Sequence, residues 1–222
     1  MTTIRSLYRT LFSEYGHQGW WPLYNKKTGK IEYHQNDYSL PKNKEQSFEI
    51  GVGAILTQNT SWKNVEKALL NLYENNLLQR DIIMDVSEKK LAGLIRPVGY
   101  FNQKAKKLKI FANFKDEINR ENLLNLWGIG KETADSILCY AHNKKIFVVD
   151  AYTQRIFTRL GFKDSEYDEI QQLVMDELLD IKELNEFHAL LVELGKNTCK
   201  KEPLCGQCCL KKVCAYGQGA SP

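Results

Sequence analysis

The chain has 222 residues and a mass of 25.7 kDa, enough for one large domain or two small ones that each bury a core. Hydrophobic residues make up 43% of the chain, which excludes a disordered or fibrous protein. The net charge of +4 gives weak support for a partner with a phosphate backbone. No segment approaches the roughly 18 uninterrupted apolar residues of a membrane span, so we expect no membrane partner and a cytoplasmic, nucleoid-associated protein.

Apolar residues recur at spacings of three and four along most of the chain, which predicts an almost entirely helical protein. The first predicted helix covers residues 3–15. Residues 16–46 break the pattern, so we expect a long loop there, with a short hairpin at 25–30. A further helix contains Phe48. The remaining helices are predicted at 61–74, 87–95, 102–114, 121–127, 131–141, 151–161, 168–180 and 185–196.

Aromatic residues gather around the long loop. Trp20 and Trp21 are adjacent in the sequence GWWP, and Phe48 follows in the next helix. Such residues serve either as core and lid or as an aromatic pocket for a ligand, and the sequence leaves both interpretations open. The helix predicted at 102–114 contains four lysines, which indicate either a solvated basic face or a DNA contact. They are Lys104, Lys106, Lys107 and Lys109.

The stretch LWGIGKETA joins two predicted helices through a very short turn. We expect a turn this tight to require glycine at both Gly128 and Gly130. Between them, Ile129 is expected to act as an apolar plug, and Lys131 begins the second helix. The unpaired N–H groups at a helix start bind anions, and glycines allow another backbone to approach closely. The turn is therefore either a simple connection between packed helices or an anchor for a phosphate.

An apolar run ends in Asp150, directly before the helix predicted at 151–161. Aspartate is a preferred N-cap, so Asp150 has a structural interpretation, in which it accepts hydrogen bonds from N–H groups near Thr153. It also has a catalytic interpretation, and the two are compatible because a cap fixes the side chain.

Five of the six cysteines lie within the last 24 residues, which is typical of a metal site and not of a disulfide framework. Cys199, Cys205, Cys208 and Cys214 give the spacing C-x5-C-x2-C-x5-C, and Cys209 competes with Cys208 as third ligand. Spacing alone allows either zinc or a cubane iron-sulfur cluster.

The hairpin followed by the apolar segment and Asp150 resembles the helix-hairpin-helix DNA glycosylases of the endonuclease III superfamily. The resemblance implies an all-α, two-lobed fold with DNA bound in the cleft between the lobes. One lobe would comprise residues 1–46 and 136–222 and include an iron-sulfur loop at 199–214. The other would be a central bundle, residues 47–135, ending in the helix-hairpin-helix at 121–142.

The cysteine spacing is similar to the iron-sulfur loop of these relatives, with one residue fewer in the first gap. The resemblance therefore implies a 4Fe-4S cluster, with zinc as the alternative. It favours Cys208 over Cys209, because Cys208 keeps the last two spacings of the family.

The segments WWP and FEIGVGAILTQNTSWKNVEKAL resemble the branch that includes bacterial 3-methyladenine DNA glycosylases. The resemblance implies a monomer that binds double-stranded DNA with a damaged base and cleaves the N-glycosidic bond with Asp150 as catalytic residue. Gln58 would wedge into the gap left by the flipped nucleotide. The expected base pocket consists of Trp20, Trp21, Phe48, Glu132 and Lys196. The expected DNA contacts are Gln58, Gly128, Ile129, Gly130 and Lys131.

Glu132 separates two kinds of chemistry. Bifunctional members of the superfamily carry a lysine at this position, which attacks the sugar and leads to strand cleavage. Lys131 is one residue earlier and points about 100° away around the helix, so it cannot replace that lysine. We therefore expect a glycosylase with little or no lyase activity, acting on alkylated purines.

Three competing functions remain. An endonuclease III-type glycosylase and lyase for oxidised pyrimidines is disfavoured by Glu132. A mismatch adenine glycosylase would carry a further domain after the cysteines, whereas this sequence ends eight residues beyond Cys214. A non-catalytic iron-sulfur DNA-binding module would be indifferent to loss of Asp150.

Overall fold

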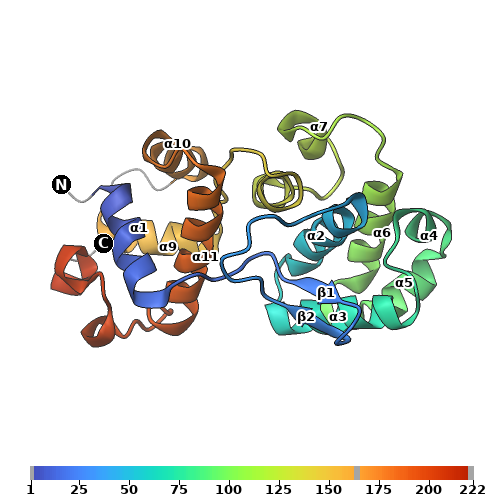
Figure 1. Ribbon diagram of the computed structural model, residues 1–222, viewed down its shortest axis with the longest axis horizontal. Coiled ribbons are helices and arrows are strands. Elements are labelled where there is room, and N and C mark those ends of the chain that lie inside the picture. The colour runs from blue at the N-terminus through green and yellow to red at the C-terminus, as the bar shows by residue number, and fades with distance from the viewer. Residues whose placement is uncertain (1–2, 163–165, 220–222) are drawn as a thin grey trace. The chain divides into compact units, whose positions relative to one another are not determined.

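The computed structural model describes residues 3–162 and 166–219, which fold into two compact units (Figure 1). Among the described residues, unit 1 contains 3–20, 34–38, 144–162 and 166–219, and unit 2 contains 21–33 and 39–143. No helix in these described ranges is long and apolar enough to cross a membrane.

The unit boundaries differ from the expected divisions at 46/47 and 135/136. Residues 131–141 form one uninterrupted helical segment, α8 (Lys131–Ser136) followed by a π-helical turn (Ile137–Ala141), and this segment packs with α2. A division at 135/136 would cut through that segment, so its second half stays with unit 2.

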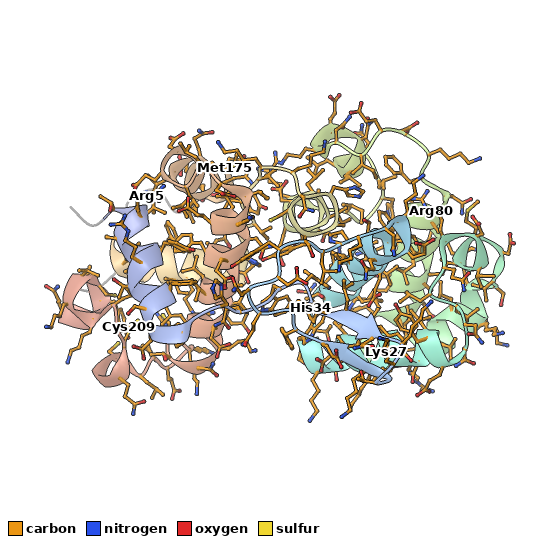
Figure 2. All side chains as sticks on the ribbon, viewed as in Figure 1. Arg5, Lys27, His34, Arg80, Met175 and Cys209 are labelled. Carbon is orange, nitrogen blue, oxygen red and sulfur yellow. The ribbon has the colours of Figure 1, made fainter. Side chains whose placement is uncertain are left out.

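Unit 1 is an all-helical bundle around α11 (Ile181–Asn197), which packs against α1 (Ile4–Tyr15) and α9 (Ala151–Leu160) (Figure 1). α10 (Tyr167–Glu177) and three 3-10 turns at Cys205–Gln207, Lys211–Val213 and Tyr216–Gln218 complete it. Its core includes Ile4, Leu7, Leu11, Phe147, Phe157, Phe187, Leu190 and Leu191. At the edge of this unit Arg5, labelled in Figure 2, donates to Glu183 at 2.8 Å.

Unit 2 is helical apart from one two-stranded hairpin. β1 (Leu23–Asn25) pairs antiparallel with β2 (Lys30–Glu32), and Tyr24 lies opposite Ile31, which confirms the short hairpin expected near 25–30. The helices are α2 (Lys44–Thr57), α3 (Trp62–Glu74), α4 (Arg80–Asp85), α5 (Glu88–Leu94), α6 (Phe101–Asn113), α7 (Arg120–Leu124) and α8, with a 3-10 turn at Arg96–Val98.

Helix α2 forms the centre of unit 2, and every residue from Phe48 to Leu56 is buried. Two of its glycines explain how neighbours reach it. A Cβ at Gly51 would lie 2.5 Å from the Phe111 ring, and a Cβ at Gly53 would lie 3.0 Å from Nε1 of Trp21. Both aromatic rings therefore pack directly on the α2 backbone.

Candidate active site and nucleic-acid interface

Asp150 is the N-cap of α9, as its sequence position predicts. Its backbone is extended, and its Oδ1 accepts hydrogen bonds from the backbone N–H of Thr153 at 2.7 Å and from Thr153 Oγ1 at 2.8 Å. The buried residues Phe147 to Val149 precede it and anchor the segment in the core of unit 1. The two hydrogen bonds to Oδ1 and the buried segment that precedes Asp150 fix the carboxylate in place.

His188 lies beside the same carboxylate. It is located on α11 and is 7% exposed, and its Nε2 lies 3.8 Å from Oδ2 of Asp150. Burial alone would raise the pKa of Asp150, but the interaction with His188 and the hydrogen bonds from Thr153 outweigh burial, and the pKa lies below its ordinary value. The carboxylate is therefore ionised at neutral pH.

Sequence reasoning did not single out His188. A signal existed, because this histidine interrupts the apolar run of the predicted helix at 185–196 and faces inward with Phe187 and Leu191. The pattern could not identify the partner of His188, because Asp150 is 38 positions away in the sequence.

The hairpin turn, residues 125–130, connects α7 to α8. Ile129 is 6% exposed and its N–H donates to Leu126 O at 3.0 Å, so it is the expected apolar plug. Gly128 has a φ of +81°, and a Cβ there would lie 2.4 Å from Cε of Lys107. The positive φ therefore favours glycine at position 128, and an added Cβ would also force the Lys107 side chain to move.

The expectation that the turn requires both glycines is wrong for Gly130. It is the N-cap of α8 with φ −95° and ψ 178°, which any residue adopts, and a Cβ at this position would meet nothing within 4 Å. The protein's own packing does not demand glycine here. The open space in front of Gly130 is available to a partner that approaches the backbone.

Gln58 ends α2 and bridges it to the hairpin. Its Nε2 donates to Gly128 O at 3.0 Å and to Thr133 Oγ1 at 2.9 Å, while its Oε1 accepts from Lys107 Nζ at 2.5 Å. In this structure both ends of the amide are held, the nitrogen by the hairpin and the oxygen by Lys107 of α6. To enter a DNA duplex, Gln58 would have to leave these three hydrogen bonds.

Two further groups lie at the hairpin surface. Lys131 and Glu132 are exposed in the first turn of α8, where a carboxylate is favoured by the helix dipole. Trp127, directly before Gly128, is 51% exposed, and Lys106 Nζ lies 4.8 Å from its ring centroid. The sequence prediction assigned no role to Trp127.

The four lysines of α6 do not form one basic face. Lys104 is 2% exposed and its Nζ donates to Leu56 O and Val98 O, both at 2.9 Å, and burial lowers its pKa to about 8. Lys109 donates to the backbone of residues 84 and 86 at the end of α4. Only Lys106 and Lys107 lie at the hairpin.

The expected aromatic pocket residues have separate surroundings. Trp21 is 8% exposed and packs its ring 5.3 Å from those of both Trp62 and Tyr140, so it is a core residue of unit 2. Phe48 stacks on Phe111 at 5.6 Å, and the guanidinium of Arg80, labelled in Figure 2, lies 5.7 Å from its ring.

Phe48 also lines an open cavity of about 730 Å³ within unit 2, together with Lys44 and His142. Trp20 and Lys196 belong to unit 1, whereas Trp21, Phe48 and Glu132 belong to unit 2. A base pocket shared by all five residues therefore stays a prediction.

The four expected ligand cysteines line one small cavity of about 20 Å³ in unit 1, and Cys209 does not line it. N–H groups point at two of the sulfurs: Arg159 Nη1 donates to Cys199 Sγ at 3.3 Å, and Gly217 N donates to Cys214 Sγ at 3.4 Å. Within residues 3–162 and 166–219, no three His, Cys, Asp or Glu side chains are arranged to hold a metal ion. The structure thus gathers the cysteines without displaying a formed single-ion site.

Comparison with known proteins agrees with this geometry. Residues 52–178 match the family described as HhH-GPD superfamily base excision DNA repair protein. A protein of Methanocaldococcus jannaschii that is provisionally named a DNA repair glycosylase is 43% identical, and the alignment covers 95% of each chain. Endonuclease III of Thermotoga maritima is 29% identical over 80% of this chain and 87% of its own.

Two solved structures share the fold. The 3-methyladenine DNA glycosylase of Helicobacter pylori, bound to 1,N6-ethenoadenine, superposes with a TM-score of 0.69 at 30% identity and covers 88% of this chain and 98% of its own. A non-covalent complex of endonuclease III with DNA superposes with a TM-score of 0.77 at 21% identity and covers 98% of both chains.

Proposed function

Because the chain belongs to the HhH-GPD superfamily of base excision DNA repair proteins, we propose that it is a monofunctional DNA N-glycosylase for alkylated purines. Its substrates are 3-methyladenine and, secondarily, 7-methylguanine in double-stranded DNA, and its product is an abasic site. It acts as a monomer. The observation that carries the proposal is the fixed, ionised carboxylate of Asp150 at the N-terminus of α9.

Asp150 supplies the chemistry of base removal. As the N-glycosidic bond breaks, positive charge develops on the sugar, and an ionised carboxylate stabilises that charge. The same carboxylate then orients a water molecule and accepts its proton as the water adds to the sugar. The low pKa of Asp150 suits both tasks, because a protonated acid would perform neither.

Glu132 supports hydrolysis without strand cleavage. A lyase step starts with attack of an amine on the sugar and formation of a Schiff base. Position 132 presents a carboxylate, and the neighbouring Lys131 follows a different direction around α8. Water is therefore the nucleophile in this proposal.

The choice of alkylated purines rests on leaving-group chemistry and on similarity. Methylation of a ring nitrogen makes a purine cationic and electron-poor, so it leaves with little acid assistance and binds well between aromatic faces. We assign Trp20, Trp21, Phe48, Glu132 and Lys196 to the base pocket. Trp21 is a core residue of unit 2, so its role is to support the pocket. The 30% identity to a 3-methyladenine DNA glycosylase supports this substrate class.

The hairpin supplies the anchor for the DNA backbone. The open space at Gly130 allows a phosphate to reach the N–H groups at the start of α8, and Lys131 adds a charge beside them. The buried Ile129 side chain anchors the turn. Gln58 fills the gap left by the flipped nucleotide after its hydrogen bonds with Gly128, Thr133 and Lys107 break.

The cysteine loop is proposed to hold a 4Fe-4S cluster through Cys199, Cys205, Cys208 and Cys214. These four residues fit the group because they share one cavity and because N–H groups already point at two of the sulfurs. The cluster would supply rigidity to the loop, which carries the exposed Lys200, Lys201, Lys211 and Lys212. Zinc is the alternative occupant.

The decisive experiment compares wild type with Asp150→Asn on duplexes that contain 3-methyladenine, 7-methylguanine, an oxidised pyrimidine or an adenine mismatch. Base release and strand breakage are scored separately. We expect release of methylated purines without breakage, and a loss of about 100-fold or more in the variant. Release of oxidised pyrimidine with breakage would favour an endonuclease III-type enzyme, and the absence of any release would favour a binding module.

A further inference from the structure

The two oxygens of Asp150 have different surroundings. Oδ1 already accepts two hydrogen bonds from Thr153, at 2.7 and 2.8 Å. Oδ2 faces His188, whose Nε2 lies 3.8 Å away. Since Oδ1 is held by the helix cap, Oδ2 is the oxygen that remains for a reacting sugar or water molecule, and the His188 side chain lies beside it.

His188 is held firmly at this position. It lies within the continuous buried stretch from Glu186 to Val192 of α11, the helix that packs against α9. The edge of its ring meets Phe147, with centroids 6.4 Å apart and planes inclined by 81°. Phe147 is three residues before Asp150, so the same segment that delivers the carboxylate also supports the imidazole.

We propose that His188 is a positioning residue for Asp150, which holds Oδ2 with its Nε2–H and keeps the carboxylate oriented and ionised for base release. The inference rests on the proposed glycosylase function. The imidazole need not be charged for this role, because neutral histidine with its proton on Nε2 is a hydrogen-bond donor. A small closure of the 3.8 Å separation on DNA binding completes the hydrogen bond.

Other charged groups near α11 are engaged elsewhere. From α9, Arg155 donates to Gly195 O at 3.1 Å and Cys199 O at 3.0 Å, at the far end of the helix. From α1, Tyr8 meets the ring of Phe187. On α11 itself, Glu186 accepts from Gln18 N at 2.7 Å and from Tyr38. The groups that lower the pKa of Asp150 against its burial are His188 and Thr153.

Two substitutions separate positioning from packing. His188→Leu removes the donor and keeps an apolar side chain of similar bulk, whereas His188→Gln keeps an N–H donor. We expect His188→Leu to slow single-turnover base release by about 10- to 100-fold and to move the acid limb of the rate–pH profile to higher pH. We expect His188→Gln to recover most of the rate. Thermal melting and DNA affinity serve as folding controls.

A readout independent of activity is the carboxyl carbon resonance of Asp150 in protein labelled with 13C-aspartate, assigned through its loss in Asp150→Asn. His188→Leu should raise the pKa of this carboxyl relative to wild type, because burial is then opposed by Thr153 alone. An unchanged titration overturns the proposal even if Asp150→Asn is inactive. An active Asp150→Asn instead refutes the proposed function, and a raised pKa in His188→Leu would still support the contact.

Discussion

Replacing Gly128 by alanine tests the hairpin most directly. A non-glycine residue at a positive φ costs about 1–2 kcal/mol, and the φ here is +81°. The added Cβ would also lie 2.4 Å from Cε of Lys107, so that side chain must move and give up its hydrogen bond to Gln58, a loss of about 1 kcal/mol. Gly128→Ala should therefore lower the free energy of unfolding by about 2–3 kcal/mol, which for a chain of this size lowers Tm by about 4–12 °C.

The matched control is Gly130→Ala. Its backbone is extended and its Cβ would meet nothing within 4 Å, so we expect a change in stability within about 0.5 kcal/mol. If DNA approaches this face, Gly130→Ala should nevertheless weaken binding to DNA. Thermal melts and fluorescence anisotropy with a labelled duplex measure the two effects. Equal melting temperatures for Gly128→Ala and wild type, or equal losses for both variants, would refute the reasoning.

Burial raises the pKa of Glu49 to about 7, although two hydrogen bonds oppose the shift. The folded state therefore binds more protons than the unfolded chain between about pH 4.5 and 7, and the free energy of unfolding falls by about 3 kcal/mol as pH rises through this window. Urea titrations at several pH values should show a flatter dependence of this free energy on pH in Glu49→Gln. Cys208→Ser should abolish the visible absorption of the proposed cluster whereas Cys209→Ser retains it, and the opposite result would exchange their roles. Duplex DNA should quench the fluorescence of the exposed Trp127, and an identical quench in Trp127→Phe would contradict this contact. Borohydride should trap no covalent complex with an abasic duplex, since Glu132 offers no amine; a trapped species would restore the lyase alternative.

Local features were predictable from the sequence because neighbouring residues determine them. Asp150 caps α9 and Ile129 plugs the hairpin, as expected. Capping and short turns depend on residues three or four positions apart, which a sequence displays directly. The helical class was also correct, since periodicity reports it.

Features that depend on distant residues were not predictable. The interaction of His188 with Asp150 and the three hydrogen bonds of Gln58 join residues tens of positions apart, and no spacing rule reveals them. Gly130 looked equivalent to Gly128 in the sequence, although the turn favours glycine only at position 128. Glycine is chosen for several reasons, and only the surrounding atoms distinguish them.

The two glycines of α2 also determine how unit 2 folds. Each costs a helix interior about 1 kcal/mol, so this segment is a poor helix by itself and depends on Phe111 and Trp21 covering its backbone. Helix formation and tertiary docking are thus one cooperative event, and we expect amide protons of α2 to exchange only through global opening of the unit. A loss of activity on truncating Trp21 would consequently report the unfolding of α2 and its neighbours. It would give information about base stacking only if hydrogen exchange showed that α2 remains folded in the variant.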